Sequence, residues 1–150
     1  MLENIESLLP IPPQGQHLKT LIVGFEEESV AEMKRLLSTL SIDVEGVVLA
    51  QVRRINPGTY LGSGKLEEIH AEVERLQVDS VIIDIDLSPN QLRNIEKILS
   101  RPTIDRPGVI IEIFSKHART REAKTQVELA LLQYLLPRLR HFWTHFERQR

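Results

Sequence analysis

The chain has 150 residues, 41% of them hydrophobic and 27% charged, so it is long enough and apolar enough to bury one core. It contains no cysteine, which excludes disulfides, cysteine-based zinc sites and a thiol nucleophile. The formal net charge of −2 hides an asymmetry, because residues 1–115 carry 11 Lys and Arg against 18 Asp and Glu, whereas residues 116–150 carry 8 against 3. With neither a signal peptide nor an apolar run of roughly 18–20 residues, the sequence leads us to expect a cytoplasmic protein with an electropositive C-terminal segment.

Strand and helix patterns are expected to alternate along most of the chain. Residues 1–17 are rich in proline and predict a flexible lead-in. The connections that follow are too long for hairpins, so residues 18–115 predict an α/β fold with a four-stranded parallel sheet flanked by helices. Strands are expected at residues 18–24, 44–52, 80–85 and 109–114, and helices at residues 28–40, 65–76 and 88–99.

Residues 116–150 predict one long, basic, amphipathic helix that begins near Thr120. Its apolar residues, at spacings of three and four, form a stripe too long for a small sheet to cover. The far half of the stripe therefore needs another partner, either a second helix outside this chain or a second copy of the chain. The residues expected to pack against that partner are Leu139, Phe142, Trp143 and Phe146.

A glycine-rich segment, Gly62-Ser63-Gly64-Lys65, follows a predicted strand and opens a predicted helix. It fails the phosphate-binding pattern G-x-x-x-x-G-K-[ST] twice, because Thr59 stands where the first glycine belongs and Leu66 stands where the hydroxyl residue belongs. A glycine turn at a helix start is the favoured interpretation. Weak binding of ATP or another nucleotide by Gly62, Gly64 and Lys65 remains an alternative.

Other candidate chemistry is weaker. Asp84, with Asp86 two residues later, ends an apolar strand, as acids often do in parallel sheets. His141 and His145 share a helix face but have no evident third ligand, so no metal site is expected. No catalytic residue is predicted either, because no nucleophile, base and acid can be assembled from the sequence.

The C-terminal basic residues are candidates for contacts with RNA phosphates, and neighbouring aromatic residues could stack on bases. The alternative is a solvated face opposite an apolar stripe. The predicted RNA-binding residues are Arg119, Arg121, Lys124, Arg138, Arg140, His145, Arg148 and Arg150.

Several segments of the sequence resemble the HflX family of ribosome-associated GTPases. The resemblance runs through residues 56–69, including N-P-G-T-Y-L-G-S-G-K, then 87–94, 104–114, 118–130, 135–139 and 143–149. It implies a small parallel α/β subdomain, a long helical hairpin and a GTPase domain. In such proteins the hairpin loop is directed at the peptidyl-transferase centre of the large ribosomal subunit, and the family splits or rescues stalled ribosomes.

Under this resemblance the chain holds the α/β part and the first hairpin helix but no GTPase domain. GTP and Mg²⁺ are then expected for full-length members, and no cofactor is expected for this chain alone. The implied partners are the large ribosomal subunit and its RNA, the second hairpin helix and the GTPase domain. The alternatives are a nucleotide-binding module and an inert fragment that self-associates through the uncovered apolar stripe.

Overall fold

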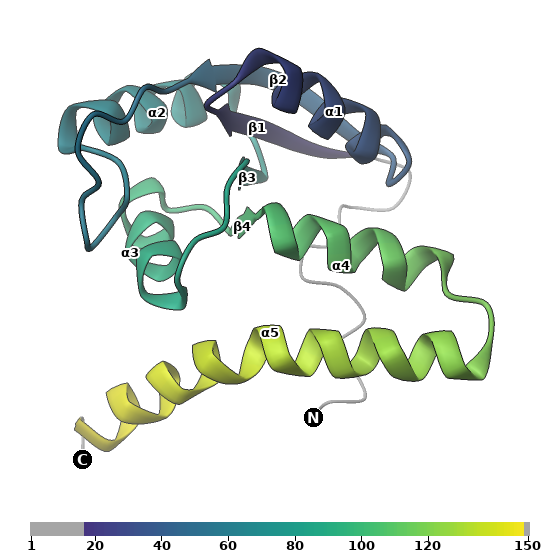
Figure 1. The fold of residues 1–150 in the computed structure, drawn as a ribbon. Coiled ribbons are helices and arrows are strands. Elements are labelled where there is room, and N and C mark those ends of the chain that lie inside the picture. Colours follow the sequence, from purple (N-terminus) through teal and green to yellow (C-terminus); the bar gives the residue numbers. More distant parts are fainter. Residues whose placement is uncertain (1–16, 149–150) are drawn as a thin grey trace.

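The computed structural model describes residues 17–148, with side chains described for residues 17–138. It confirms the α/β fold, a four-stranded parallel sheet with flanking helices and one long C-terminal helix (Figure 1). The strands lie in the order β2-β1-β3-β4, and every neighbouring pair is parallel. Their bounds are β1 (Leu18–Gly24), β2 (Ile42–Leu49), β3 (Ser80–Ile83) and β4 (Thr103–Asp105).

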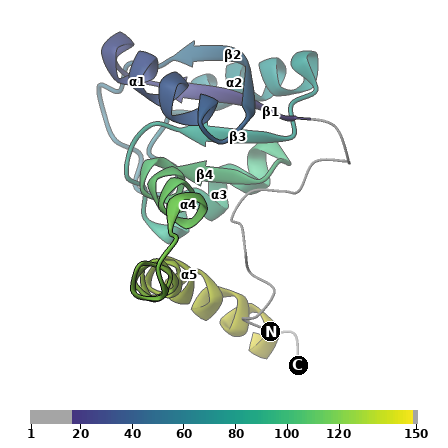
Figure 2. The same cartoon turned by 90° about the vertical axis from the view of Figure 1, so that its right-hand side faces the viewer.

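Helices cover both faces of this sheet (Figures 1 and 2). On one face, Ile22 of β1 shares a buried cluster with Met33 and Val109 from two different helices. On the other face, Leu21 of β1 shares a second buried cluster with Ile69 of one further helix and with residues of another. The helices are α1 (Glu27–Ser38) and α4 (Arg106–His117) on the first face, α2 (Ser63–Leu76) and α3 (Pro89–Leu99) on the second, and α5 (Arg121–Arg148) beyond α4.

The strand at residues 80–83 explains why an almost continuous apolar run predicts a parallel sheet. Its four residues are all buried, and β1 and β4 lie on either side of it. Because helices cover both of its faces, side chains that alternate between the faces all enter a core. The predicted start of α3 is also confirmed. The backbone amide of Gln91 donates to Ser88 Oγ, and the backbone amide of Ser88 donates to Gln91 Oε1, at a distance of 3.1 Å in each case.

The prediction of a strand at residues 109–114 is wrong, because these residues form the middle of α4. Asp105 caps this helix by accepting a hydrogen bond from the Gly108 amide, and Pro107 occupies its first turn. Val109 and Glu112 are buried and Ile113 is partly buried, at the i, i+3, i+4 spacing of one helix face. The true fourth strand is only three residues long and comes directly before the helix.

The long helix α5 begins as expected, with the Ala123 amide donating to Thr120 Oγ over 3.0 Å. The chain reverses direction at residues 118–120, so α5 runs antiparallel beside α4 (Figure 1). Among the described helices, none has both the length and the apolar character that crossing a membrane requires. Residues 1–16 of the predicted lead-in lie outside the described residues, as do the side chains of Leu139, Phe142, Trp143 and Phe146.

Candidate nucleic-acid interface

A hydrogen-bonded joint centred on Asp105 attaches α5 to the sheet. The buried Asp105 carboxylate ends β4 and accepts hydrogen bonds from the amides of Gly108 (3.2 Å) and Leu87 (3.1 Å). It also accepts a 2.6 Å hydrogen bond from the Tyr134 hydroxyl on α5. One side chain therefore joins the sheet, the start of α4 and the middle of α5, and we name Asp105, Gly108, Tyr134 and Arg138 the α5 joint.

Arg138 belongs to this joint although the sequence suggested an RNA contact. Its guanidinium lies 3.4 Å from the centroid of the Tyr134 ring, a cation–π contact. Its Nη2 lies 3.9 Å from Asp105 Oδ2, Nη1 donates to the Tyr134 carbonyl, and the side chain is only 21% exposed. These intramolecular contacts with Tyr134 and Asp105 fix the guanidinium of Arg138 in place.

The joint raises the pKa of Tyr134 well above that of a free phenol. Burial is the largest cause, followed by the charge of Asp105 and the hydrogen bond to it. An ionised phenol would face the Asp105 carboxylate without its proton, so the folded protein holds the neutral form.

Replacing Tyr134 by Phe is expected to lower the free energy of unfolding by about 2 kcal/mol near neutral pH, because a hydrogen bond to a buried carboxylate is lost. The folded pKa is raised, so this stabilisation is present below the unfolded pKa of about 10 and declines as the pH rises above it. The difference between wild type and variant should thus be constant up to about pH 9 and shrink above about pH 10 in urea unfolding. Tyr60→Phe, which removes the hydroxyl of the second tyrosine of the chain, is the control and should lower the free energy of unfolding by less than about 0.5 kcal/mol. A difference that grows at high pH would contradict the joint.

The turn between α4 and α5, together with the adjoining ends of the two helices, carries four exposed cations. Lys116, Arg119, Arg121 and Lys124 are exposed, and their side chains form no hydrogen bond or ion pair with any described residue. Only one carboxylate, that of Glu122, lies between them in the sequence. We name these four cations the basic turn. Exposed guanidinium and ammonium groups within nine consecutive residues suit the phosphates of a nucleic acid.

The predicted RNA-binding residues therefore separate into three groups. Arg119, Arg121 and Lys124 are exposed and belong to the basic turn, as does Lys116 of α4. Arg138 is engaged in the α5 joint, and its RNA contact stays a prediction. The side chains of Arg140, His145, Arg148 and Arg150 lie outside the described residues, so their RNA contacts stay predictions.

The glycine segment lies at the exposed N-terminus of α2. Gly62 precedes the first turn, and Gly64 and Lys65 lie within it. Lys65 Nζ is 3.1 Å from Glu68 Oε2, and a Cβ added at Gly62 or Gly64 would meet no atom within 4 Å, so neither glycine is needed for a close backbone approach. Leu66, where a phosphate-binding loop has its magnesium-binding hydroxyl, is buried in the core. These residues do not fit the triphosphate and magnesium site of a GTPase, and weaker nucleotide binding stays a prediction.

The strand-end acid Asp84 is part of a structural network. Its carboxylate is fully buried and accepts hydrogen bonds from Ser29 Oγ (2.7 Å) and Arg106 Nη1 (2.9 Å). Arg106 Nη2 lies 3.0 Å from Glu32 Oε1. The network lies beyond the carboxyl ends of the neighbouring strands β1 and β3, where open parallel sheets commonly bind ligands. The described residues contain no group of three or more His, Asp or Glu side chains that could hold a metal ion.

Asp105 and Tyr134 were not predicted as functional positions from the sequence. The available signals were the order Asp105, Pro107, Gly108, which is typical of a helix cap, and a tyrosine within an otherwise apolar helix face. Neither signal specifies the other residue, because the two are brought together only by the turn between α4 and α5.

Comparison with known proteins places this arrangement in a family. Residues 27–115 match the family described as GTP-binding GTPase N-terminal, and residues 117–150 match GTP-binding GTPase Middle Region. The GTPase HflX of Flavobacterium psychrophilum is 41% identical over 141 residues, which cover 88% of this chain and 34% of that protein. The chain belongs to the HflX family of GTPases. The GTPase HflX of Escherichia coli is 39% identical over 123 residues, covering 82% of this chain and 29% of its own length.

Solved structures agree with this membership. A GTP-binding protein from Sulfolobus solfataricus in complex with GDP has a TM-score of 0.66 and 28% identity, covering 88% of this chain and 42% of that chain. A complex described as SsGBP and GDP has a TM-score of 0.68 and 29% identity, covering 83% of this chain and 37% of that chain. The chain therefore spans about a third of the length of the HflX relatives it matches, in their N-terminal part.

Proposed function

We propose that this chain is the RNA-binding N-terminal region of an HflX-family GTPase that acts on the large ribosomal subunit, in ribosome splitting or rescue. The observation that carries the proposal is the basic turn: four exposed cations without described partners, at the end of two helices that the α5 joint fixes to the sheet. GTP binding and hydrolysis belong to the remainder of such a protein, because Gly62–Leu66 does not fit a triphosphate site.

Charge distribution supports one direction of approach to RNA. Residues 18–115 carry 11 Lys and Arg against 16 Asp and Glu, a net charge of −5, so the body of the domain repels a phosphate backbone. The basic turn lies at one end of the α4–α5 pair, beyond the sheet (Figure 1). Repulsion by the body and attraction by the turn together favour an end-on contact through the turn.

The salt dependence of binding to purified large subunits tests this proposal. Replacing Arg119 and Arg121 by Gln should reduce the slope of log K against log salt by about 1.5, because each neutralised phosphate contributes about 0.7 to 0.9. At about 0.1 M salt this corresponds to a loss of affinity of about 30-fold. The same change in charge at Lys34 and Arg35, two exposed cations of α1, is the control and should leave the slope unchanged. Equal losses in both variants would refute a role for the turn.

We also propose that α5 packs against the second hairpin helix of the full-length protein, and the outer face of α5 supports this. Leu129 and Leu136, two turns apart, are 51% and 57% exposed, whereas Val127 and Leu131 are partly buried. The exposed apolar face thus differs from the face that carries Val127 and Leu131. A second copy of the chain is the competing occupant, and light scattering that shows a dimer lost on changing Leu129 and Leu136 to Gln would favour it.

A further inference from the structure

The long helix α5 is packed more loosely than the other helices. Each of α1, α2, α3 and α4 buries three of its residues. Between Arg121 and Arg138, the part of α5 whose side chains the structure describes, no side chain is fully buried. Tertiary packing of an apolar face supplies most of the stability of a helix in a protein, so apolar burial holds α5 less firmly than it holds the other four helices.

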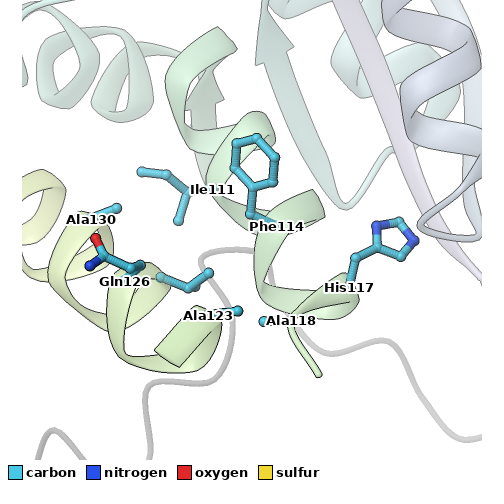
Figure 3. A pocket seen from close by; sticks show the side chains of 8 residues that line it. Ile111, Phe114, His117, Ala118, Ala123, Gln126 and Ala130 are labelled. Atoms are coloured by element: carbon cyan, nitrogen blue, oxygen red, sulfur yellow. The ribbon is translucent and has the colours of Figure 1, made fainter. Parts of the chain in front are cut away.

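An apolar groove lies between α4 and α5, next to the turn that joins them (Figure 3). It has a volume of about 350 Å³. Ile111 and Phe114 line the groove from α4, and Val127 and Ala130 line it from α5. Because protein interiors are close-packed, an opening of this size shows that the two helices make only part of the apolar contact available to them.

The α5 joint provides the polar attachment of α5 to the sheet. The Tyr134 hydroxyl donates to the buried Asp105 carboxylate over 2.6 Å, and Arg138 lies beside the same carboxylate. Asp105 also accepts hydrogen bonds from the amides of Gly108 and Leu87, neither of which belongs to α5. If α5 moves away, the buried carboxylate therefore keeps two partners, and the high cost of an unpaired buried charge is avoided.

Helical hydrogen bonding is interrupted on both sides of this attached segment. Helix α4 ends at His117, and Ala118 has an extended backbone, with φ of −71° and ψ of 116°. At the other side, Pro137 lies inside α5 and has no amide to donate to the carbonyl of Gln133. The attached segment of α5 thus lies between a pivot at residues 118–120 and a weakened helical turn.

We propose that α5 releases as a unit from the sheet and the other four helices, pivoting at residues 118–120, with the hydrogen bond from Tyr134 to Asp105 as its latch. Lys116 and Arg119 precede α5, so release moves the far end of α5 and leaves these two cations in place. The proposal does not depend on RNA binding. In a full-length protein, the second hairpin helix proposed above would move together with α5.

Amide hydrogen exchange of the full chain tests the latch. A released α5 is a single helix interrupted by Pro137, and isolated helices are marginal in water, so its amides lose protection. With Tyr134→Phe, the amides of residues 125–134 should exchange faster by one common factor of about 30, the equivalent of about 2 kcal/mol. Acceleration confined to the amides next to position 134, or none at all, would mean that α5 frays locally and would overturn the proposal.

Ile69→Val separates release of α5 from unfolding of the whole chain. Ile69 of α2 is fully buried on the opposite face of the sheet from α4, so this change weakens the core and leaves the latch intact. The amides of β1 and β3 should exchange about fivefold faster, whereas those of residues 125–134 should be unchanged. Equal acceleration of both sets would show that α5 opens only when the whole chain unfolds, which contradicts release as a unit.

Discussion

Replacing Arg106 by Ala is expected to lower the free energy of unfolding by about 3 kcal/mol, because removal of one partner of a buried ion pair leaves a charge without compensation. The Asp84 side chain is fully buried and would keep only the hydrogen bond from Ser29. For a chain of this length the loss corresponds to a fall in Tm of about 10 °C. Urea and thermal unfolding measure both quantities.

Glu32→Gln provides the control on the same guanidinium. Glu32 also contacts Arg106, but its side chain is 50% exposed, so its loss should cost less than about 1 kcal/mol. The double variant Asp84→Asn with Arg106→Ala should lose less than the sum of the single variants, because the uncompensated charge is gone. Additive losses would mean that Arg106 acts through packing and not through Asp84.

Gly108→Ala is expected to destabilise the protein by about 2 kcal/mol, although alanine stabilises a helix relative to glycine by up to about 1 kcal/mol. A Cβ at this position would lie 2.4 Å from Ile104 Cγ1 and 2.9 Å from the Tyr134 hydroxyl oxygen. Helix α4 can therefore approach β4 and α5 this closely only with glycine at this position. Unfolding in urea measures the loss.

Gly64→Ala is the matched control, since it also places alanine in the first turn of a helix. A Cβ at Gly64 would meet no atom within 4 Å, so this variant should be neutral or stabilised by up to about 1 kcal/mol. Combining Gly108→Ala with Tyr134→Phe should cost less than the two single losses together, because one of the clashing atoms is removed. If both glycine variants behave alike, the α5 joint is less tightly packed than the distances indicate.

Much of the sheet could be predicted from the sequence because burial produces a local pattern. The strand at residues 80–83 is buried on both faces and is therefore apolar along most of its length, and the hydroxyl and amide of Ser88 and Gln91 form a cap within four residues. Both features depend on neighbours in sequence, so no long-range information is needed.

The fourth strand was misplaced for a physical reason. Residues 109–114 are β-branched or aromatic except for Glu112, and such a run predicts a strand, yet the cap formed by Asp105 and the packing of Val109 and Ile113 on the sheet stabilise a helix. Ile111 and Phe114 of this run line an apolar groove between α4 and α5, so their apolar character has a different cause from burial in a sheet. A strand of three residues, 103–105, is too short to show a period.

The position of the cationic residues could be predicted from the sequence more easily than the contacts that their side chains make. The excess of cations after residue 115 is evident, and three of the predicted residues lie in the basic turn. That Arg138 is held by Tyr134 and Asp105 depends on contacts between Asp105 and residues 29 and 33 positions later, which no local pattern contains.

Directed hydroxyl-radical cleavage of large-subunit RNA tests the central claim, that the basic turn faces RNA, most directly. Because the chain lacks cysteine, an iron chelate can be tethered at Glu122→Cys in the turn, or at Glu67→Cys on α2 as the control. Both positions are exposed glutamates on helices, and α2 covers the opposite face of the sheet from α4. We predict discrete cleavage of the RNA from position 122 and none from position 67. Cleavage from position 67 alone, or no cleavage from position 122 in a bound complex, would contradict the claim.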